Sequence, residues 1–478
     1  MGSAAAALSS EHLYQQLADE LGAQIDAGRL RPGERLPSVR RTSRQRGVSV
    51  STVVQAYQLL EGRGLVEARP QSGHYVRPRA KLELLEPRAP KACSAPTKVS
   101  VQEQVARIYR AMRDPRLVPL GAAVLSPELL PGERLSRTLA SIARLAGSRG
   151  LLYEPPPGAP PLRRQLARRS VIWGAPLAAD EFVITVGAME ALALALRAVT
   201  KPGDAVAVES PAYYGLLQLI ESMELRAVEV PSGPSGMDLE QLDVALKQHR
   251  VRAVLAVPNF SNPGGGLMPD RNKEALVDLL ARREIPLIED DIYGDLNHEG
   301  ERPRPAKAWD KNGLVLLCGS FSKTLAPGFR TGWISAGRFQ AQVEHLKFTY
   351  SVGTATLPQL ALAEFLEGGA YEHYLRGLRR RLVHQVEAHR LAIAESFPAG
   401  TRVSSPQGGH VLWVELPAGT DATEVARRAL DAGISVAEGP LFSARGRFKN
   451  FIRLNAGNPF NAGIEQALRT VGALCRAR

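Results

Sequence analysis

The spacing of hydrophobic residues in the first eighty positions predicts a small helical unit. Leu13, Leu17 and Leu21 recur at every fourth position, which is typical of one amphipathic helix over residues 11–27. Turn residues and shorter periodic runs then predict, in order, a helix over 38–46, a helix over 51–63, and strands over 65–69 and 74–76. Three helices followed by a two-stranded hairpin are therefore expected.

Beyond about residue 114, short apolar runs alternate with long helical patterns. The runs cover 182–186, 205–209, 253–257, 286–289 and 314–318. Such alternation predicts βαβ units around a mainly parallel sheet. From about residue 349 the pattern becomes α+β, with a long basic helix over 371–397 and strands over 409–415 and 451–455.

A proline-rich stretch between residues 78 and 100 predicts a partly extended linker between these regions. The expected organisation is a mainly α unit over 8–78, a linker over 79–113 that includes a short amphipathic helix over 101–112, and an α/β domain over 114–478. Within that domain we expect a large subdomain over about 150–345 and a small α+β subdomain over about 346–478.

Composition narrows the class of protein. The chain has 478 residues, 44% of them hydrophobic, and a formal net charge of +12, which favours polyanionic partners without identifying one. The three cysteines are far apart and have no metal-ligand spacing, so neither a zinc site nor a disulfide framework is expected. We read no signal peptide and no membrane span, and expect a cytoplasmic protein.

Basic residues are concentrated in the second predicted helix. Residues 29–46 contain seven arginines and one acid, and the next helix starts with small hydroxyl residues. Two helices joined by a tight turn with basic flanks suit DNA binding in the major groove, whereas the alternative is a solvated basic face. The candidate contacts are Arg40, Arg44, Arg46, Ser49, Ser51 and Thr52.

The sequence of this region resembles that of the GntR superfamily of winged helix-turn-helix regulators. The resemblance covers residues 11–77 and rests on Leu36-Pro37-Ser38-Val39-Arg40, Gly47-Val48-Ser49, Ala56-Tyr57 and Gly64-Leu65-Val66. It implies that Arg40 contacts double-stranded DNA and that the wing at Gly73 reaches the minor groove. Val50 stands where the family has a second DNA-contacting arginine, and Arg44, Arg46 and Ser51 are candidates to replace it.

The densest cluster of chemical groups follows the run at 314–318. Lys323 follows Ser320 and Ser322, and Arg330 comes seven residues after the lysine. An amine beside hydroxyls and a cation suits a carbonyl compound that carries a phosphate: Lys323 would form a Schiff base while the other three residues hold the phosphate. The alternative is a basic loop. The segment Ser320–Trp333 resembles the lysine signature of fold-type I, class I/II aminotransferases, which implies pyridoxal 5′-phosphate (PLP) as cofactor.

Other segments resemble the same family and imply further roles. Asp290 would bond the pyridine nitrogen, with Asp291 as the competing assignment. Tyr293 and Asn262 would bond the ring phenolate oxygen. Tyr213 would stack on the ring, although it or Tyr214 could be a core tyrosine.

Three more assignments follow from the resemblance. The turn of Gly187, Ala188 and Met189 at a helix start would bind the phosphate. Tyr153 would reach the phosphate of a neighbouring subunit, which implies a homodimer. Arg453, an arginine inside an apolar strand, would bind a substrate α-carboxylate, the alternative being a salt-bridged structural residue.

The two domains, in this order and joined by a linker, resemble the MocR subfamily of GntR regulators. The expected fold is thus an N-terminal winged helix-turn-helix followed by an aminotransferase-like α/β domain with a small α+β subdomain. The expected function is a PLP-dependent transcriptional regulator that senses PLP, vitamin B6 or an amino compound through an aldimine on Lys323. The alternative is an active aminotransferase with an appended DNA-binding domain.

Overall fold

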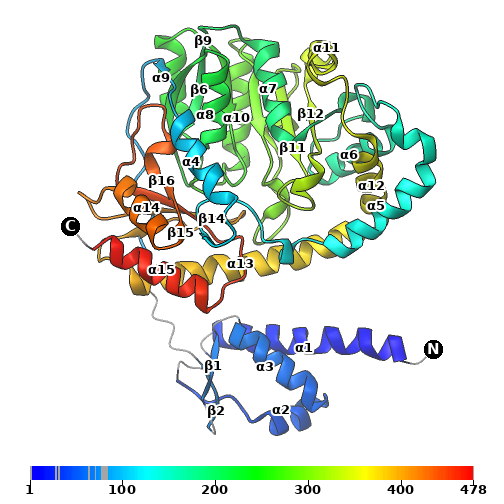
Figure 1. Ribbon diagram of the computed structural model, residues 1–478, viewed down its shortest axis with the longest axis vertical. Coiled ribbons are helices and arrows are strands. Elements are labelled where there is room, and N and C mark those ends of the chain that lie inside the picture. The colour runs from blue at the N-terminus through cyan, green and yellow to red at the C-terminus, as the bar shows by residue number, and fades with distance from the viewer. Residues whose placement is uncertain are drawn as a thin grey trace. The chain divides into compact units, whose positions relative to one another are not determined.

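The computed structural model describes residues 3–26, 29–30, 33–62, 65–69, 72–76 and 84–476. The chain forms two compact units, Met1–Glu83 and Leu84–Arg478 (Figure 1). The smaller unit has its own hydrophobic core, formed by residues that include Leu17, Leu21 and Tyr57.

The N-terminal unit contains the three helices and the hairpin that the sequence predicts. Its elements are α1 Ser3–Asp26, α2 Val39–Arg46, α3 Val50–Gly62, and the antiparallel strands β1 Val66–Arg69 and β2 Gly73–Val76. The Ser38 side chain caps α2 by accepting a hydrogen bond from the Arg41 backbone N–H at 3.3 Å, and Gly47 ends that helix at a φ of 64°. The first helix begins earlier than expected, and residues 31–32, between the first two helices, lie outside the described residues.

Residues 84–113 differ from the linker that the sequence predicts, because they pack on the C-terminal unit. β3 Thr97–Lys98 extends the large sheet, and α4 Gln102–Met112 buries Val105 and Ile108 in its core. Together with the buried Val101, these residues form an apolar face that is stable only when covered. The expected domain start at residue 114 is therefore wrong, and residues 79–83 of the expected linker are outside the described residues.

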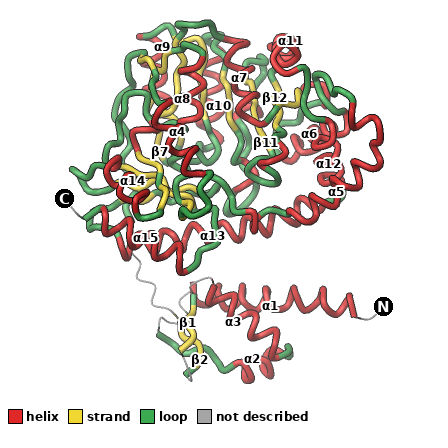
Figure 2. Tube along the Cα trace, in the orientation of Figure 1, coloured by secondary structure: helices red, strands yellow, loops and turns green. Residues whose placement is uncertain are grey.

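A large, mainly parallel sheet confirms the α/β prediction. Within the described residues its strand order is β3-β7-β6-β9-β10-β11-β12-β5, with β8 paired to β7. The strands are β5 Val183–Thr185, β6 Ala205–Ser210, β7 Arg226–Gly233, β8 Gly236–Met237, β9 Val251–Ala256, β10 Leu287–Asp290, β11 Val315–Ser320 and β12 Gly332–Ser335. Figure 2 shows the strands of this sheet between helices.

The helices of this region follow the expected alternation. They are α5 Gly132–Ala146, α6 Pro160–Ile172, α7 Gly187–Val199, α8 Tyr214–Ser222, α9 Leu239–Gln248, α10 Asp270–Ala281, α11 Gln340–Ser351 and α12 Thr356–Glu367.

A second, antiparallel sheet forms the small subdomain. Its order is β13-β14-β17-β16, from β13 Arg402–Val403, β14 Val411–Glu415, β16 Ala437–Glu438 and β17 Phe451–Asn455. β15 Ile434–Ser435 pairs separately with β4 Val118–Pro119, and α14 Ala422–Asp431 and α15 Ala462–Leu474 complete the subdomain. The predicted basic helix is α13 Ala370–Ser396, which runs from near α5 toward α15 and the small sheet (Figure 1).

The sheet topology brings the ends of several strands to one edge. β6, β9, β10 and β11 are parallel neighbours, so their carboxyl ends lie together, and β5 ends at the same edge because it and β11 both run antiparallel to β12. Ligands of open α/β sheets bind at such an edge. No helix within the described ranges is long and apolar enough to cross a membrane, and no acidic, histidine or cysteine cluster suited to a metal occurs there.

Candidate functional site

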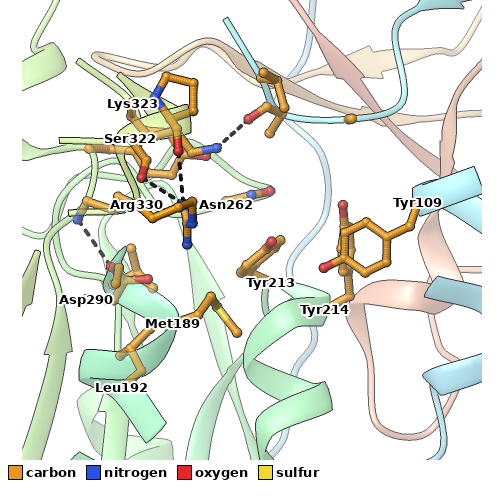
Figure 3. A pocket seen from close by; sticks show the side chains of 18 residues that line it. Tyr109, Met189, Leu192, Tyr213, Tyr214, Asn262, Asp290, Ser322, Lys323 and Arg330 are labelled. Atoms are coloured by element: carbon orange, nitrogen blue, oxygen red, sulfur yellow. Dashed lines mark hydrogen bonds between the residues drawn. The ribbon is translucent and has the colours of Figure 1, made fainter. Parts of the chain in front are cut away.

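A cavity of about 240 Å³ lies at this edge of the sheet (Figure 3). Most of the sequence-predicted cofactor residues line it. The lining residues are Tyr109, Ala122, Ala123, Val124, Ala188, Met189, Leu192, Tyr213, Tyr214, Val257, Asn262, Asp290, Ile292, Tyr293, Ser322, Lys323, Pro327 and Arg330.

Lys323 stands in the loop after β11, with its amine in the cavity. Its Nζ donates a hydrogen bond to the Ala123 carbonyl at 2.5 Å. Burial, and then the positive charge of Arg453, lower the pKa of Lys323 to about 8, although Asp290 acts in the opposite direction. The amine is therefore uncharged and nucleophilic at a lower pH than that of an ordinary lysine.

The structure separates the two candidate carboxylates. Asp290 lines the cavity, and burial raises its pKa to about 7. Asp291 does not line the cavity: its Oδ2 accepts from the Arg302 guanidinium and its Oδ1 accepts from Asn259 Nδ2 at 2.8 Å. Because Asp291 is held in a buried ion pair, Asp290 is the acid available to a ligand.

Basic and backbone groups converge where the loop after β11 meets the start of α7. Arg330 Nη1 donates to Ser322 Oγ at 3.3 Å, and Nη2 donates to the Val186 carbonyl at 3.4 Å. Ser322 Oγ lies 2.7 Å from Ser320 Oγ, although Ser320 itself does not line the cavity. A Cβ at Gly187 would lie 2.5 Å from Arg330 Nη2, so only glycine, at its φ of +73°, leaves space there.

Three tyrosines form the aromatic side of the cavity. The rings of Tyr213 and Tyr214 lie 4.7 Å apart, and both residues line the space. Tyr214 also packs against Phe442, at 5.5 Å between ring centroids, so part of its ring belongs to the hydrophobic core. Tyr109 of α4 hydrogen-bonds to Tyr213. It was not among the residues predicted from the sequence. The apolar face of residues 101–112 was the signal that could have assigned this helix to the C-terminal domain.

Arg453 is fully buried on β17. Its Nη1 donates to Asn262 Oδ1 at 3.1 Å and its Nη2 donates to the Gly121 carbonyl, while its Nε has no partner. Asn262 also hydrogen-bonds to Tyr293, whose pKa burial raises. No described carboxylate forms an ion pair with Arg453, so the salt-bridged alternative has no support among the described residues.

Tyr153 does not line the cavity and, unlike Ser320 and Gly187, has no contact with a described residue that lines it. It follows α5 and is 85% exposed. It therefore makes no contribution to the site of its own chain.

The DNA-binding candidates lie on and around α2 and α3. Arg40 and Arg44 are exposed and form no ion pair with a described residue, whereas Arg46 pairs with Glu20 at 2.8 Å. Gly73 is in the hairpin at a φ of +108°, where a Cβ would lie 3.1 Å from Arg35 Nε.

The hydroxyl residues at the start of α3 bond one another. Ser49 Oγ accepts from the Thr52 backbone N–H at 3.1 Å and lies 2.8 Å from Ser51 Oγ and 2.7 Å from Thr52 Oγ1. Thr52 is buried, so its expected direct contact with DNA is wrong: the residue completes the helix cap instead.

Comparisons with known proteins agree with both units. Residues 128–471 match the family described as "Aminotransferase class I and II", and residues 13–76 match "Bacterial regulatory proteins, gntR family". The sequence is 40% identical to the "Uncharacterized HTH-type transcriptional regulator YdcR" of Escherichia coli K12, over 97% of this chain and 99% of that protein. It is 30% identical to the "HTH-type pyridoxine biosynthesis transcriptional regulator PdxR" of Corynebacterium glutamicum, over 77% and 76%.

Solved structures match the C-terminal unit. The α-aminoadipate aminotransferase LysN of Thermus thermophilus, complexed with N-(5′-phosphopyridoxyl)-L-leucine, superposes with a TM-score of 0.72 at 28% identity and covers 79% of this chain and 98% of that one. The multiple substrate aminotransferase of Thermococcus profundus gives 0.73 at 27% identity, over 78% and 94%.

Proposed function

Because the chain belongs to the class I and II aminotransferase family and carries a domain of the gntR family of bacterial regulatory proteins, we propose that it is a DNA-binding transcriptional regulator that senses vitamin B6 or an amino compound through PLP. The observation that carries the proposal is its likeness, over almost the whole of both chains, to an HTH-type transcriptional regulator. The intact cofactor cavity supports the sensing role.

The cavity fits PLP, since it offers a partner to each reactive group of a phosphopyridine aldehyde. Lys323 offers an amine of lowered pKa to the aldehyde, and Asp290 offers a buried acid to the ring nitrogen. The space left by Gly187, beside the Arg330 guanidinium, suits a phosphate.

Each residue has a defined task in this proposal. Lys323 would hold the cofactor covalently through Nζ and would move a proton at the Cα of a bound amine. Asp290 would keep the ring nitrogen protonated, and Tyr213 would stack on the ring. Tyr293 and Asn262, which already bond each other, would bind the phenolate oxygen.

The phosphate and the effector would occupy opposite ends of the site. The phosphate would be held by Ser320, Ser322, Arg330 and the backbone amides of Gly187, Ala188 and Met189. Arg453, whose Nε has no partner, would bind the α-carboxylate of an amino compound. When bound, PLP supplies an electron sink for the Cα of that amine.

On the DNA side, Arg40 and Arg44 would contact phosphates of a promoter duplex, because both are exposed and carry no counter-charge among the described residues. The wing at Gly73 would lie near the minor groove. Arg46 would contribute less, since it already pairs with Glu20.

The proposal includes a homodimer. Leu145, Leu151 and Tyr153 are 80%, 86% and 85% exposed, far more than large apolar side chains usually are. A second copy covering them would allow Tyr153 to reach the partner's cofactor phosphate. Sedimentation of the purified protein tests this, and Tyr153→Phe should weaken PLP binding only if the site is shared.

An active aminotransferase is the second candidate, and one observation favours it: the Lys323 amine and the Asp290 acid line one cavity, and the buried Arg453 bonds Asn262, which also lines it. The two functions are separated by the full-length protein with PLP and candidate amino acids. Specific, effector-dependent binding to a DNA fragment, with cofactor conversion that stops at one equivalent, supports the regulator. Steady amino transfer to a keto acid without specific DNA binding would overturn it.

A further inference from the structure

The outward face of α3 carries apolar side chains at its start. Val53, Ala56, Tyr57 and Leu60 of this helix face the core. On the opposite side, Val50 is 50% and Val54 is 37% exposed.

These two valines are one helical turn apart and therefore lie on the same side of the helix. They form an exposed apolar strip at the start of α3, beside the exposed Ser51 and Gln55.

The hydroxyl groups at this end of the helix already have hydrogen-bond partners. The Ser51 and Thr52 hydroxyls both bond Ser49 Oγ, which in turn caps the helix. A base that sought hydrogen bonds from these groups would compete with bonds that already exist. The exposed valines, in contrast, have no internal hydrogen bond to lose on contact with a partner.

Charge around the strip identifies the partner. Arg40, Arg41 and Arg44 of α2 are exposed and form no ion pair with the part of the chain that the structure describes. Arginines of this kind bind the phosphates of a duplex and place the second helix of the pair in the major groove. In that groove the apolar group on a base edge is the C5 methyl group of thymine.

We propose that Val50 and Val54 read thymine methyl groups, so that the recognition site contains thymines whose methyl groups matter more to binding than their hydrogen-bonding edges. The inference rests on the proposed DNA-binding function and specifies its sequence chemistry. One buried methyl-sized group is worth about fourfold in affinity, from ~0.8 kcal/mol per buried CH₂ and 1.4 kcal/mol per factor of ten.

The test uses the full-length protein with PLP. It selects duplexes from a randomised library, and the strongest duplex is remade with each thymine in turn replaced by deoxyuridine, which lacks only the methyl group. We expect at least one position per half-site where this replacement weakens binding about fourfold.

The double variant Val50→Ala, Val54→Ala should bind the thymine and deoxyuridine duplexes with equal affinity. Arg44→Ala is the matched control: it should weaken both duplexes by the same factor, as loss of a phosphate contact does. Both valines are exposed, so the alanine variants are expected to fold.

The inference is overturned if no single replacement changes the wild-type affinity by more than about twofold, or if the double variant retains the wild-type preference for thymine. Failure of the protein to enrich any sequence would overturn the proposed DNA-binding function itself. Enrichment without methyl discrimination overturns this inference alone.

Discussion

The rate at which PLP attaches to Lys323 should depend on pH in a way that the cavity determines. Burial and the Arg453 charge lower the pKa of this amine to about 8, from an ordinary value near 10.5. At pH 7.5 about a quarter of Lys323 is then neutral, against roughly one part in a thousand for an ordinary lysine. Only the neutral amine adds to an aldehyde.

The pH profile follows from these fractions. The attachment rate should rise about eightfold between pH 6.5 and 7.5, because the neutral fraction rises by that factor. Between pH 8.5 and 9.5 it should rise only about 1.3-fold, whereas an ordinary lysine would gain about ninefold. Mixing cofactor-free protein with PLP in a stopped-flow instrument, and following the visible absorbance of the attached cofactor, measures both ratios.

Two variants identify the cause of the shift. Arg453→Gln removes a positive charge that lowers the pKa of Lys323, so the levelling of the profile should move to higher pH. Arg453→Lys keeps the charge and should leave the profile near its wild-type position. A wild-type rate that continues to climb about ninefold per unit above pH 8.5 would refute the reasoning, as would identical profiles for the two variants.

Three further perturbations probe the site and its support. Asp291→Asn breaks a buried ion pair and should lower the free energy of unfolding, measured by heat or urea, by about 3–5 kcal/mol. Burial raises the pKa of Asp290 to about 7, so Asp290→Asn should leave the stability at pH 8 unchanged or higher. Equal losses of stability in the two variants would contradict the assignment. Gly187→Ala places a methyl against Arg330 and strains a positive φ, so PLP affinity in a spectroscopic titration should fall about tenfold or more. A fragment of residues 114–478 lacks α4 and should aggregate or unfold at lower temperature than the complete C-terminal unit in scanning fluorimetry; equal midpoints would show that α4 is dispensable.

The candidate cofactor loop could be predicted from the sequence because its residues are close together along the chain. Ser320, Ser322, Lys323 and Arg330 lie within eleven positions after a recognisable strand, and a strand end at the sheet edge places them together. The N-terminal helices were predictable for the same reason, since their periodicity and caps are local signals.

What the sequence left open depended on contacts between distant segments. Asp290 and Asp291 are adjacent in the sequence, and the structure distinguishes them because Asp290 lines the cavity while Asp291 pairs with Arg302. Tyr109 lines the cavity because α4 packs on the large subdomain. The sequence did not predict this packing, because the proline-rich stretch before α4 indicated a linker. The burial of Thr52 could have been suspected, because Ser49 stands three positions before it as a helix-capping residue does.

The stretch from Gly121 to Ala123 is attached to both functional cations at once. Lys323 donates to the Ala123 carbonyl and Arg453 donates to the Gly121 carbonyl, two residues away. A cofactor bonded to Lys323 would therefore exchange places with a backbone carbonyl, and its affinity would be a difference between two bonding arrangements. An anion bound at the free Nε of Arg453 would leave the bond from Nη2 to Gly121 in place. Occupancy of Lys323 would thus release one end of a backbone stretch whose other end Arg453 keeps fixed.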